Sequence, residues 1–246
     1  MKNFATQRPA LFAFLLMLAL EAIVLGALLL SNLAGIPILS LDLPILLLNA
    51  IVAAILIGAM RWWKETGFNA PSEWKNMRLY LLPLALLVGP TLFFQPQIPS
   101  PASKIIILII VTLLIGFQEE AIFRGILIRA FRPQGVMKAV LISAALFGVI
   151  HVNSLLVGRD PIFVLSQVVA SFLGAIGLGA LSVRTNTLVP LVLLHAFNDF
   201  LQFSATGGME AGDVNLTIPI LKVVLSGLMA LYGFYLLRGY KEEASE

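Results

Sequence analysis

Charged residues of the kinds that perform acid–base chemistry stand inside apolar stretches of this chain. Glu119 and Glu120 are adjacent and follow the apolar run 105–116, and Arg124 comes four residues after Glu120. The chain has two histidines, His151 and His195, and both lie within long apolar runs. Charges at bilayer depth are costly, so they are usually kept where they pair or act. We therefore predict acid–base chemistry at a site inside the membrane.

The spacing of the first group separates its two carboxylates. Residues four apart face the same side of a helix, so Glu120 and Arg124 are expected to pair. Glu119 points about 100° away from Glu120 on an α-helix. One carboxylate would then be held by the arginine while the other stays free. Taken alone, the Glu120–Arg124 pair is also open to interpretation as a purely structural ion pair.

Each histidine has polar or aromatic neighbours one helical turn away. Phe147 lies four residues before His151 and could wall its imidazole. Asp199 lies four residues after His195 and could orient that ring, and Asn198 is an alternative partner. A single membrane histidine, or Asn198, can also serve only as a hydrogen bond between helices. Two glutamates, two histidines and an Asn-Asp pair occurring together favour a shared site.

The elements that must position these residues are membrane helices. Hydrophobic residues make up 59% of the 246 residues and charged residues 12%, against about 45–50% and about 25% in soluble proteins. We predict an all-α, polytopic membrane protein with a polar intramembrane cavity, folded as a single membrane domain over 1–246. A spanning helix needs about 20 mostly apolar residues, and eight segments are candidates: 10–31, 42–60, 79–95, 104–128, 137–157, 161–183, 187–204 and 216–237.

The basic residues predict the orientation. With eight spans, one side receives nearly all Lys and Arg residues, the other receives Lys104 and Arg159, and Lys222 lies within the last span. The positive-inside rule then places both termini in the cytoplasm. We expect a multi-pass protein of a bacterial cell membrane. The net charge of +3 does not point to a nucleic-acid partner, because the basic residues cluster in short loops.

The longest polar segment, 61–78, contains Trp62, Trp63 and Trp74 among mixed charges. Tryptophan is enriched at membrane–water interfaces. We predict an interfacial loop or short amphipathic helix with these rings at the level of the lipid headgroups.

The predicted topology brings the polar residues to overlapping depths. At a rise of about 1.5 Å per residue, Glu119 lies roughly 13 Å from the cytoplasmic end of its helix, His151 roughly 20 Å and His195 roughly 12 Å. Three separate helices thus contribute to one region between the cytoplasmic half and the midplane. This convergence predicts a shared cavity.

Three motifs resemble those of a known family. Glu119-Glu120-x-x-x-Arg124, within EEAIFRGIL, is similar to the EExxxR motif of the CPBP family of CAAX proteases and bacteriocin-processing proteins, also called Abi. Phe147-x-x-x-His151 resembles its FxxxH motif, and His195-x-x-x-Asp199 its HxxxN/D motif. Three motifs in order on separate helices are far more specific than one. The resemblance covers roughly 100–205, the motif-bearing core, and extends to the type II CAAX prenyl endopeptidases.

The resemblance implies roles for these residues in peptide hydrolysis. Glu119 would be the base that activates water, with Glu120 and Arg124 in support. His151, walled by Phe147, would bind and polarise the water, and His195 with Asp199 would stabilise the oxyanion. The family usually has Asn at the last position, and an ionised Asp199 beside an oxyanion would be unfavourable. Asp199 would then be protonated or only orient the ring, or Asn198 would supply the donor.

The expected activity is an intramembrane endopeptidase acting on membrane-associated peptides, whether prenylated CAAX tails or leader-type peptides. A bound divalent metal such as zinc is the alternative to metal-free catalysis, since Glu and His are suitable ligands. The chain lacks the HExxH pattern of zinc proteases, so we expect no cofactor. A non-proteolytic membrane scaffold or immunity protein of the same fold, and a proton-coupled transporter, are the alternative functions.

Overall fold

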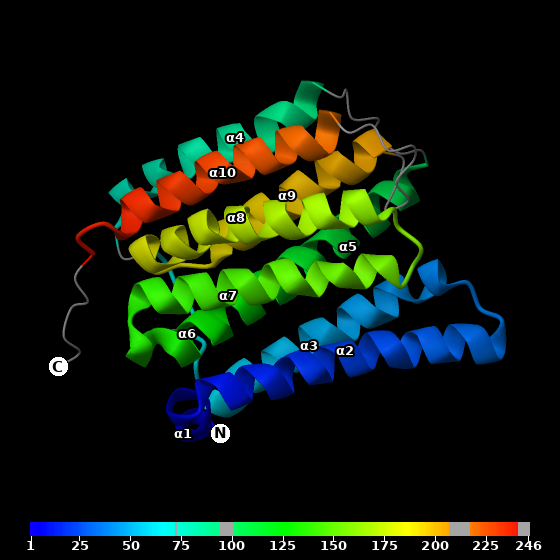
Figure 1. Cartoon of the computed structure of the whole chain (residues 1–246), viewed down its shortest axis with the longest axis horizontal. Coiled ribbons are helices and arrows are strands. Elements are labelled where there is room, and N and C mark those ends of the chain that lie inside the picture. Colours follow the sequence, from blue (N-terminus) through cyan, green and yellow to red (C-terminus); the bar gives the residue numbers. More distant parts are fainter. Residues whose placement is uncertain (72, 94–100, 207–216, 241–246) are drawn as a thin grey trace.

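The protein is a bundle of long helices that lie side by side along its longest axis (Figure 1). The structure is a computed structural model and describes residues 1–71, 73–93, 101–206 and 217–240. Its regular structure over these residues is helical, without strands. The α-helices are α1 (Lys2–Gln7), α2 (Pro9–Ala34), α3 (Asp42–Met60), α4 (Leu81–Phe93), α5 (Ala102–Glu119), α6 (Ile128–Phe131), α7 (Val136–Ile150), α8 (Pro161–Thr185), α9 (Val189–Thr206) and α10 (Thr217–Leu237). Shorter helical segments are η1 (Ile38–Leu41), η2 (Trp74–Tyr80), η3 (Glu120–Leu127), η4 (Arg132–Gln134) and η5 (His151–Leu155).

Each predicted span has a helical counterpart, and 42–60 coincides with α3. Residues 94, 95 and 216, which the predicted spans included, lie outside the described residues. In the described part of the chain, six helices are long and apolar enough to cross a membrane. Neither α4, described to Phe93, nor α9, which carries the polar residues around His195, is among them. The predicted count of eight is therefore not confirmed, although the helical membrane architecture is.

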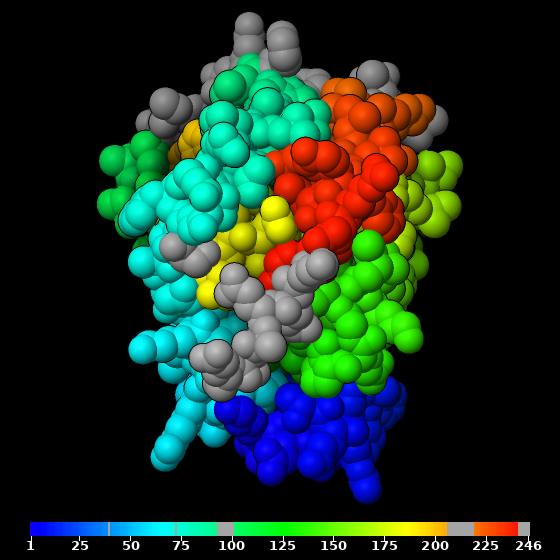
Figure 2. Space-filling view, turned by 90° about the vertical axis from the view of Figure 1, so that its left-hand side faces the viewer, coloured from blue at the N-terminus to red at the C-terminus, as the bar shows by residue number. Residues whose placement is uncertain are grey.

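One end of the bundle gathers the segments that carry most of the basic residues. The start of α2, the turn from α8 to α9 and the last turn of α10 lie together at the left of Figure 1. Figure 2 views this end, where the N-terminus, the segment around η2 and the end of α10 reach the surface. Arg8, Arg184 and Arg238 belong to these segments. The charge asymmetry of the sequence thus coincides with one end of the structure.

Two glycines let the helices that carry the polar residues approach closely. A Cβ atom on Gly116 of α5 would lie 2.7 Å from the carbonyl oxygen of Val192 on α9. A Cβ atom on Gly177 of α8 would lie 2.5 Å from the carbonyl oxygen of Met229 on α10. No side chain fits at such distances from backbone atoms. The α5–α9 approach matters most, because Glu119 and His195 each follow three residues after these contact points.

The segment after α3 folds back against the bundle, and only part of it lies at the surface. Trp62 is fully buried, whereas Trp63 and Trp74 are exposed. The carbonyl oxygen of Gly67 accepts a 2.7 Å hydrogen bond from the backbone N–H of Leu188, at the start of α9. The prediction of an interfacial position is therefore wrong for Trp62, because this docking encloses its ring within the core.

Candidate active site

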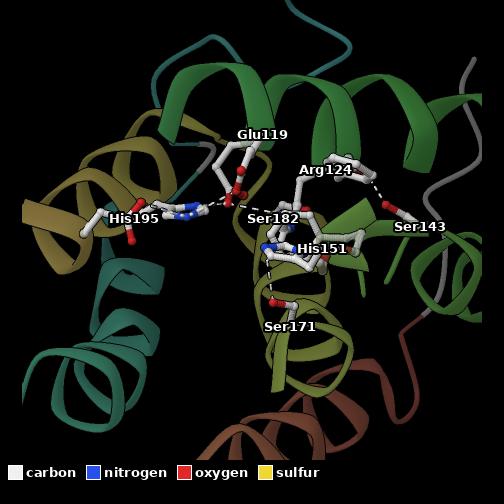
Figure 3. Close-up of polar contacts among 12 residues, drawn as sticks. Glu119, Arg124, Ser143, His151, Ser171, Ser182 and His195 are labelled. Atoms are coloured by element: carbon white, nitrogen blue, oxygen red, sulfur yellow. Dashed lines mark hydrogen bonds and ion pairs between the residues drawn. The ribbon is translucent and has the colours of Figure 1, made fainter. Parts of the chain in front are cut away.

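The site begins where α5 changes its winding. Residues from Glu120 to Leu127 form a π-helix, η3, and all eight are buried. Such wide turns are rare and often occur at functional sites. The hydroxyl of Ser143 on α7 donates a hydrogen bond to the carbonyl oxygen of Phe123 (Figure 3), which fixes this turn against its neighbour. The predicted single helix over 104–128 thus contains an irregularity at its two glutamates.

Glu120 and Arg124 form the predicted ion pair. Arg124 Nη1 lies 3.4 Å from Glu120 Oε1, and the two side chains are 1% and 0% exposed. The guanidinium also lies over the ring of Phe147, 4.2 Å from the ring centroid. A cation over an aromatic face gains electrostatic attraction, and more so when it is desolvated. The buried pair is therefore held from α7 as well as from η3.

His195 of α9 lies between the two glutamates. Its Nδ1 is 2.8 Å from Glu120 Oε1 and its Nε2 is 3.4 Å from Glu119 Oε2. Asp199 Oδ2 lies 3.6 Å from the same Nε2. Figure 3 shows the ring of His195 directed at the carboxylates of the other helix. The expectation that one carboxylate stays free is therefore wrong, because the two nitrogens of one imidazole reach both glutamates.

The two glutamates nevertheless differ in accessibility. The Glu119 side chain is 23% exposed, and those of His195 and Asp199 are 14% and 15% exposed. Glu120 is fully enclosed and has Arg124 as a cationic partner. Glu119 is thus the carboxylate that a water molecule could approach.

His151 is held by its own helix end. Its Nδ1 lies 2.7 Å from the carbonyl oxygen of Phe147, so this nitrogen donates, and Nε2 lies 3.4 Å from Ser171 Oγ on α8. The Phe147 ring meets the His151 ring edge-on at 4.9 Å between centroids and the His195 ring at 6.5 Å. The predicted contact of Phe147 with His151 is confirmed, and Phe147 packs against both imidazoles.

A cavity of about 420 Å³ opens beside these residues. Among its lining side chains are Arg124, His151, His195, Asn198 and Asp199. The remaining walls come from α4, α8 and α10 and are mostly apolar. Glu119 and Glu120 do not belong to this lining and lie next to His195. A cavity with polar side chains in its wall is thus present, and the motif residues that line it are Arg124, Phe147, His151, His195 and Asp199.

Three polar residues that sequence reasoning did not select also belong to the site. Ser171 contacts His151, and Gln202 and Lys222 line the cavity. Gln202 stands three residues after Asp199, so helical spacing could have indicated it. Ser171 and Lys222 lie on other helices than the motifs, and no spacing in the sequence links them to the site.

One more contact that sequence reasoning missed joins α2, the first long helix, to the site. Asn153 Nδ2, two residues beyond His151, donates a 2.9 Å hydrogen bond to Glu21 Oε1 on α2. These two residues are far apart in sequence. The contact connects α2 to the segment η5, which begins at His151.

The donor atoms are not arranged for a metal ion. In the described ranges, no three His, Cys, Asp or Glu side chains form a group that could hold one. Nδ1 of His151 is used by the Phe147 carbonyl, and Nδ1 of His195 by Glu120. The carboxylates of Glu119 and Asp199 both face Nε2 of His195 and not a space that an ion could occupy. The donor atoms are thus engaged with one another, and the expectation of no cofactor stays a prediction.

The fold and site define a helical membrane protein with a Glu–His–Asp cluster beside an intramembrane cavity. Residues 101–201 match the family model of Rce1-like proteins, described as "Type II CAAX prenyl endopeptidase Rce1-like". Residues 101–201, which hold all three motifs, are therefore similar to the Rce1-like family, and the resemblance inferred from the motifs is confirmed. Searches of curated proteins and of solved structures gave no match.

Proposed function

We propose that this chain is an intramembrane endopeptidase that hydrolyses peptide bonds of membrane-associated peptides by water activated at Glu119, without a metal. The observation that carries the proposal is the placement of Glu119. It is the accessible member of the glutamate pair, and its Oε2 lies 3.4 Å from His195 Nε2. A base and an electrostatic donor are thus adjacent, as acyl-group hydrolysis requires.

The chemistry divides among the residues as follows. Water bound near Glu119 gives a proton to its carboxylate while the water oxygen attacks the peptide carbonyl carbon. His151, whose Nδ1 donates to the Phe147 carbonyl, has Nε2 available to accept a hydrogen bond from that water. Nδ1–H of a protonated His195 donates to Glu120 Oε1, and its Nε2–H, 3.4 Å from Glu119 Oε2, turns to the oxyanion that forms. Glu119 then returns the proton to the leaving amine.

Glu120 and Arg124 support this arrangement without meeting substrate. Glu120 Oε1 accepts from His195 Nδ1 and fixes the ring orientation, and Arg124 balances the Glu120 charge. Phe147 packs against His151 and under the guanidinium. The substrates that we propose are prenylated CAAX tails or leader-type peptides, because the cavity walls are mostly apolar and the site lies among membrane helices.

The test is cleavage of a library of membrane-associated peptides, prenylated and unmodified, by purified protein in detergent. We expect Glu119→Gln to lower kcat by about 10²–10⁴-fold, the usual contribution of a general base, with little change in KM. His151→Ala should also abolish most activity. Glu73→Gln is the matched control, because this glutamate is exposed outside the cluster, and it should keep full activity.

A strong chelator distinguishes metal-free hydrolysis from metal-dependent hydrolysis. Activity that persists in the chelator supports metal-free hydrolysis. Activity lost to the chelator and restored by zinc would keep the peptidase and overturn the mechanism. Cleavage of no peptide, together with proton-coupled flux in reconstituted vesicles, would replace the peptidase with a transporter.

A further inference from the structure

The carboxylates around His195 outnumber the cations that the motifs supply. Glu119, Glu120 and Asp199 all lie within 3.6 Å of its ring nitrogens. Arg124 is paired with Glu120, on the Nδ1 side of the ring. Uncompensated charge is expensive at membrane depth. Asp199, on the Nε2 side, therefore needs a further positive partner if it is to stay ionised.

Lys222 of α10 is placed to be that partner. It lines the same cavity as Asp199 and His195, and Arg124 is the other Lys or Arg among the described lining residues. Its Nζ donates a 2.5 Å hydrogen bond to Gln202 Oε1 on α9. Gln202 is three residues from Asp199, so both side chains stand on one face of α9. Lys222 thus contacts the face of α9 that carries Asp199.

The rest of the structure shows why α10 can hold this position. Gly177 of α8 allows the backbone of α10 to come into contact at Met229, about two turns beyond Lys222 on the same helix. Gln202 fixes the ammonium from the α9 side. Lys222 lies outside residues 101–201, the part matched by the family model. The contact therefore adds a residue of this chain that its three motifs do not contain.

We propose that Lys222 is a positioning residue, the counter-charge that keeps Asp199 ionised so that its carboxylate can orient His195. The effect on hydrolysis rests on the proposed function, whereas the charge pairing does not. The charge of an ionised Asp199, whose Oδ2 lies 3.6 Å from His195 Nε2, attracts this side of the ring and holds its orientation. With Lys222 removed, Asp199 takes up a proton and no longer orients the ring.

The charge state of Asp199 is measured by infrared spectroscopy of the purified protein without substrate. The carbonyl stretching band of a protonated carboxyl should be absent in the wild type and present in Lys222→Met. It should vanish again in the double variant with Asp199→Asn, which assigns the band. Lys222→Arg keeps the charge and Lys104→Met removes an exposed lysine elsewhere, so neither should show the band. A band in the wild type, or none in Lys222→Met, overturns the proposal.

Kinetics test the consequence through a double-mutant cycle. We expect Lys222→Met to lower kcat about tenfold when Asp199 is present and less than about twofold in the Asp199→Asn background, since interacting residues are non-additive. Lys222→Arg should restore most of kcat. An equal loss in both backgrounds, or a loss confined to KM, would show that Lys222 contacts substrate and would overturn the positioning role. The expected infrared result in a protein that cleaves no peptide would keep the charge pair and reject the proposed function.

Discussion

At the scale of single residues, the adjacent glutamates have opposite environments. Glu120 is fully enclosed with Arg124, and Glu119 keeps 23% of its side chain exposed. A buried ion pair that loses one partner leaves an uncompensated charge, which costs about 3–5 kcal/mol. A partly exposed carboxylate has no such dependence. Substitution of Glu120 should therefore lower stability, whereas substitution of Glu119 should lower activity with little effect on stability.

We predict that Glu120→Gln lowers the free energy of unfolding by about 3–5 kcal/mol, because Arg124 stays buried without its anion. Glu119→Gln should change the free energy of unfolding by less than about 1 kcal/mol while removing activity. Equilibrium unfolding in mixed micelles measures both. The double variant Glu120→Gln/Arg124→Met should recover part of the stability, because the stranded charge is gone. Equal stability losses at Glu119 and Glu120 would contradict the assignment.

Local spacing explains which of these contacts could be predicted from the sequence. Glu120–Arg124 and Phe147–His151 lie one turn apart, so any helix brings them together. The contact of Glu120 with the imidazole of His195 joins residues 75 positions apart, and Glu119 reaches the same ring. Both contacts depend on how closely α5 meets α9, which the backbone approach at Gly116 sets. Sequence reasoning therefore gave the members of the cluster but left Glu119 without its partner.

At the scale of elements, helix bounds were predictable and helix irregularity was not. Long apolar runs bounded by charges locate membrane helices because burial in lipid requires them, and 42–60 matches α3. The π-helix η3 changes only the hydrogen-bond register, and composition carries no mark of it. The Asn153–Glu21 contact escaped for a different reason, since pairing between distant helices leaves no periodic pattern.

The contact between α8 and α10 gives a prediction at this scale. Gly177→Ala should lower the free energy of unfolding by about 1–3 kcal/mol through overpacking, because the new Cβ would meet the Met229 backbone at 2.5 Å. Gly227→Ala is the matched control on α10, since nothing lies within 4 Å of its Cβ position. It should cause no loss, as alanine favours a helix over glycine. Thermal unfolding of both variants in detergent measures the two effects. A Gly177→Ala variant as stable as the wild type would show that α8 and α10 can move apart at this contact.

At the scale of the whole molecule, the distribution of charge and the arrangement of helices support one orientation. The segments that hold Arg8, Arg184 and Arg238 meet at one end of the bundle (Figure 2). Lys104 and Arg159 stand at the starts of α5 and α8, which run toward that end from the opposite one (Figure 1). An even number of crossings would bring both termini to the same side of the membrane. Whether α4 and α9 cross is what fixes the count at eight.

The chain has no cysteine, so single introduced cysteines report this topology without background. In intact cells, a membrane-impermeant maleimide should label Lys104→Cys, Arg159→Cys and Glu210→Cys. It should leave Lys75→Cys and Arg184→Cys unlabelled until the membrane is opened, because the positive-inside rule keeps the basic end in the cytoplasm. Opposite labelling of positions 75 and 104 requires that α4 crosses, and opposite labelling of 184 and 210 requires the same of α9. If either pair is labelled from one side, that helix lies within the bundle without spanning, and the count of eight is wrong.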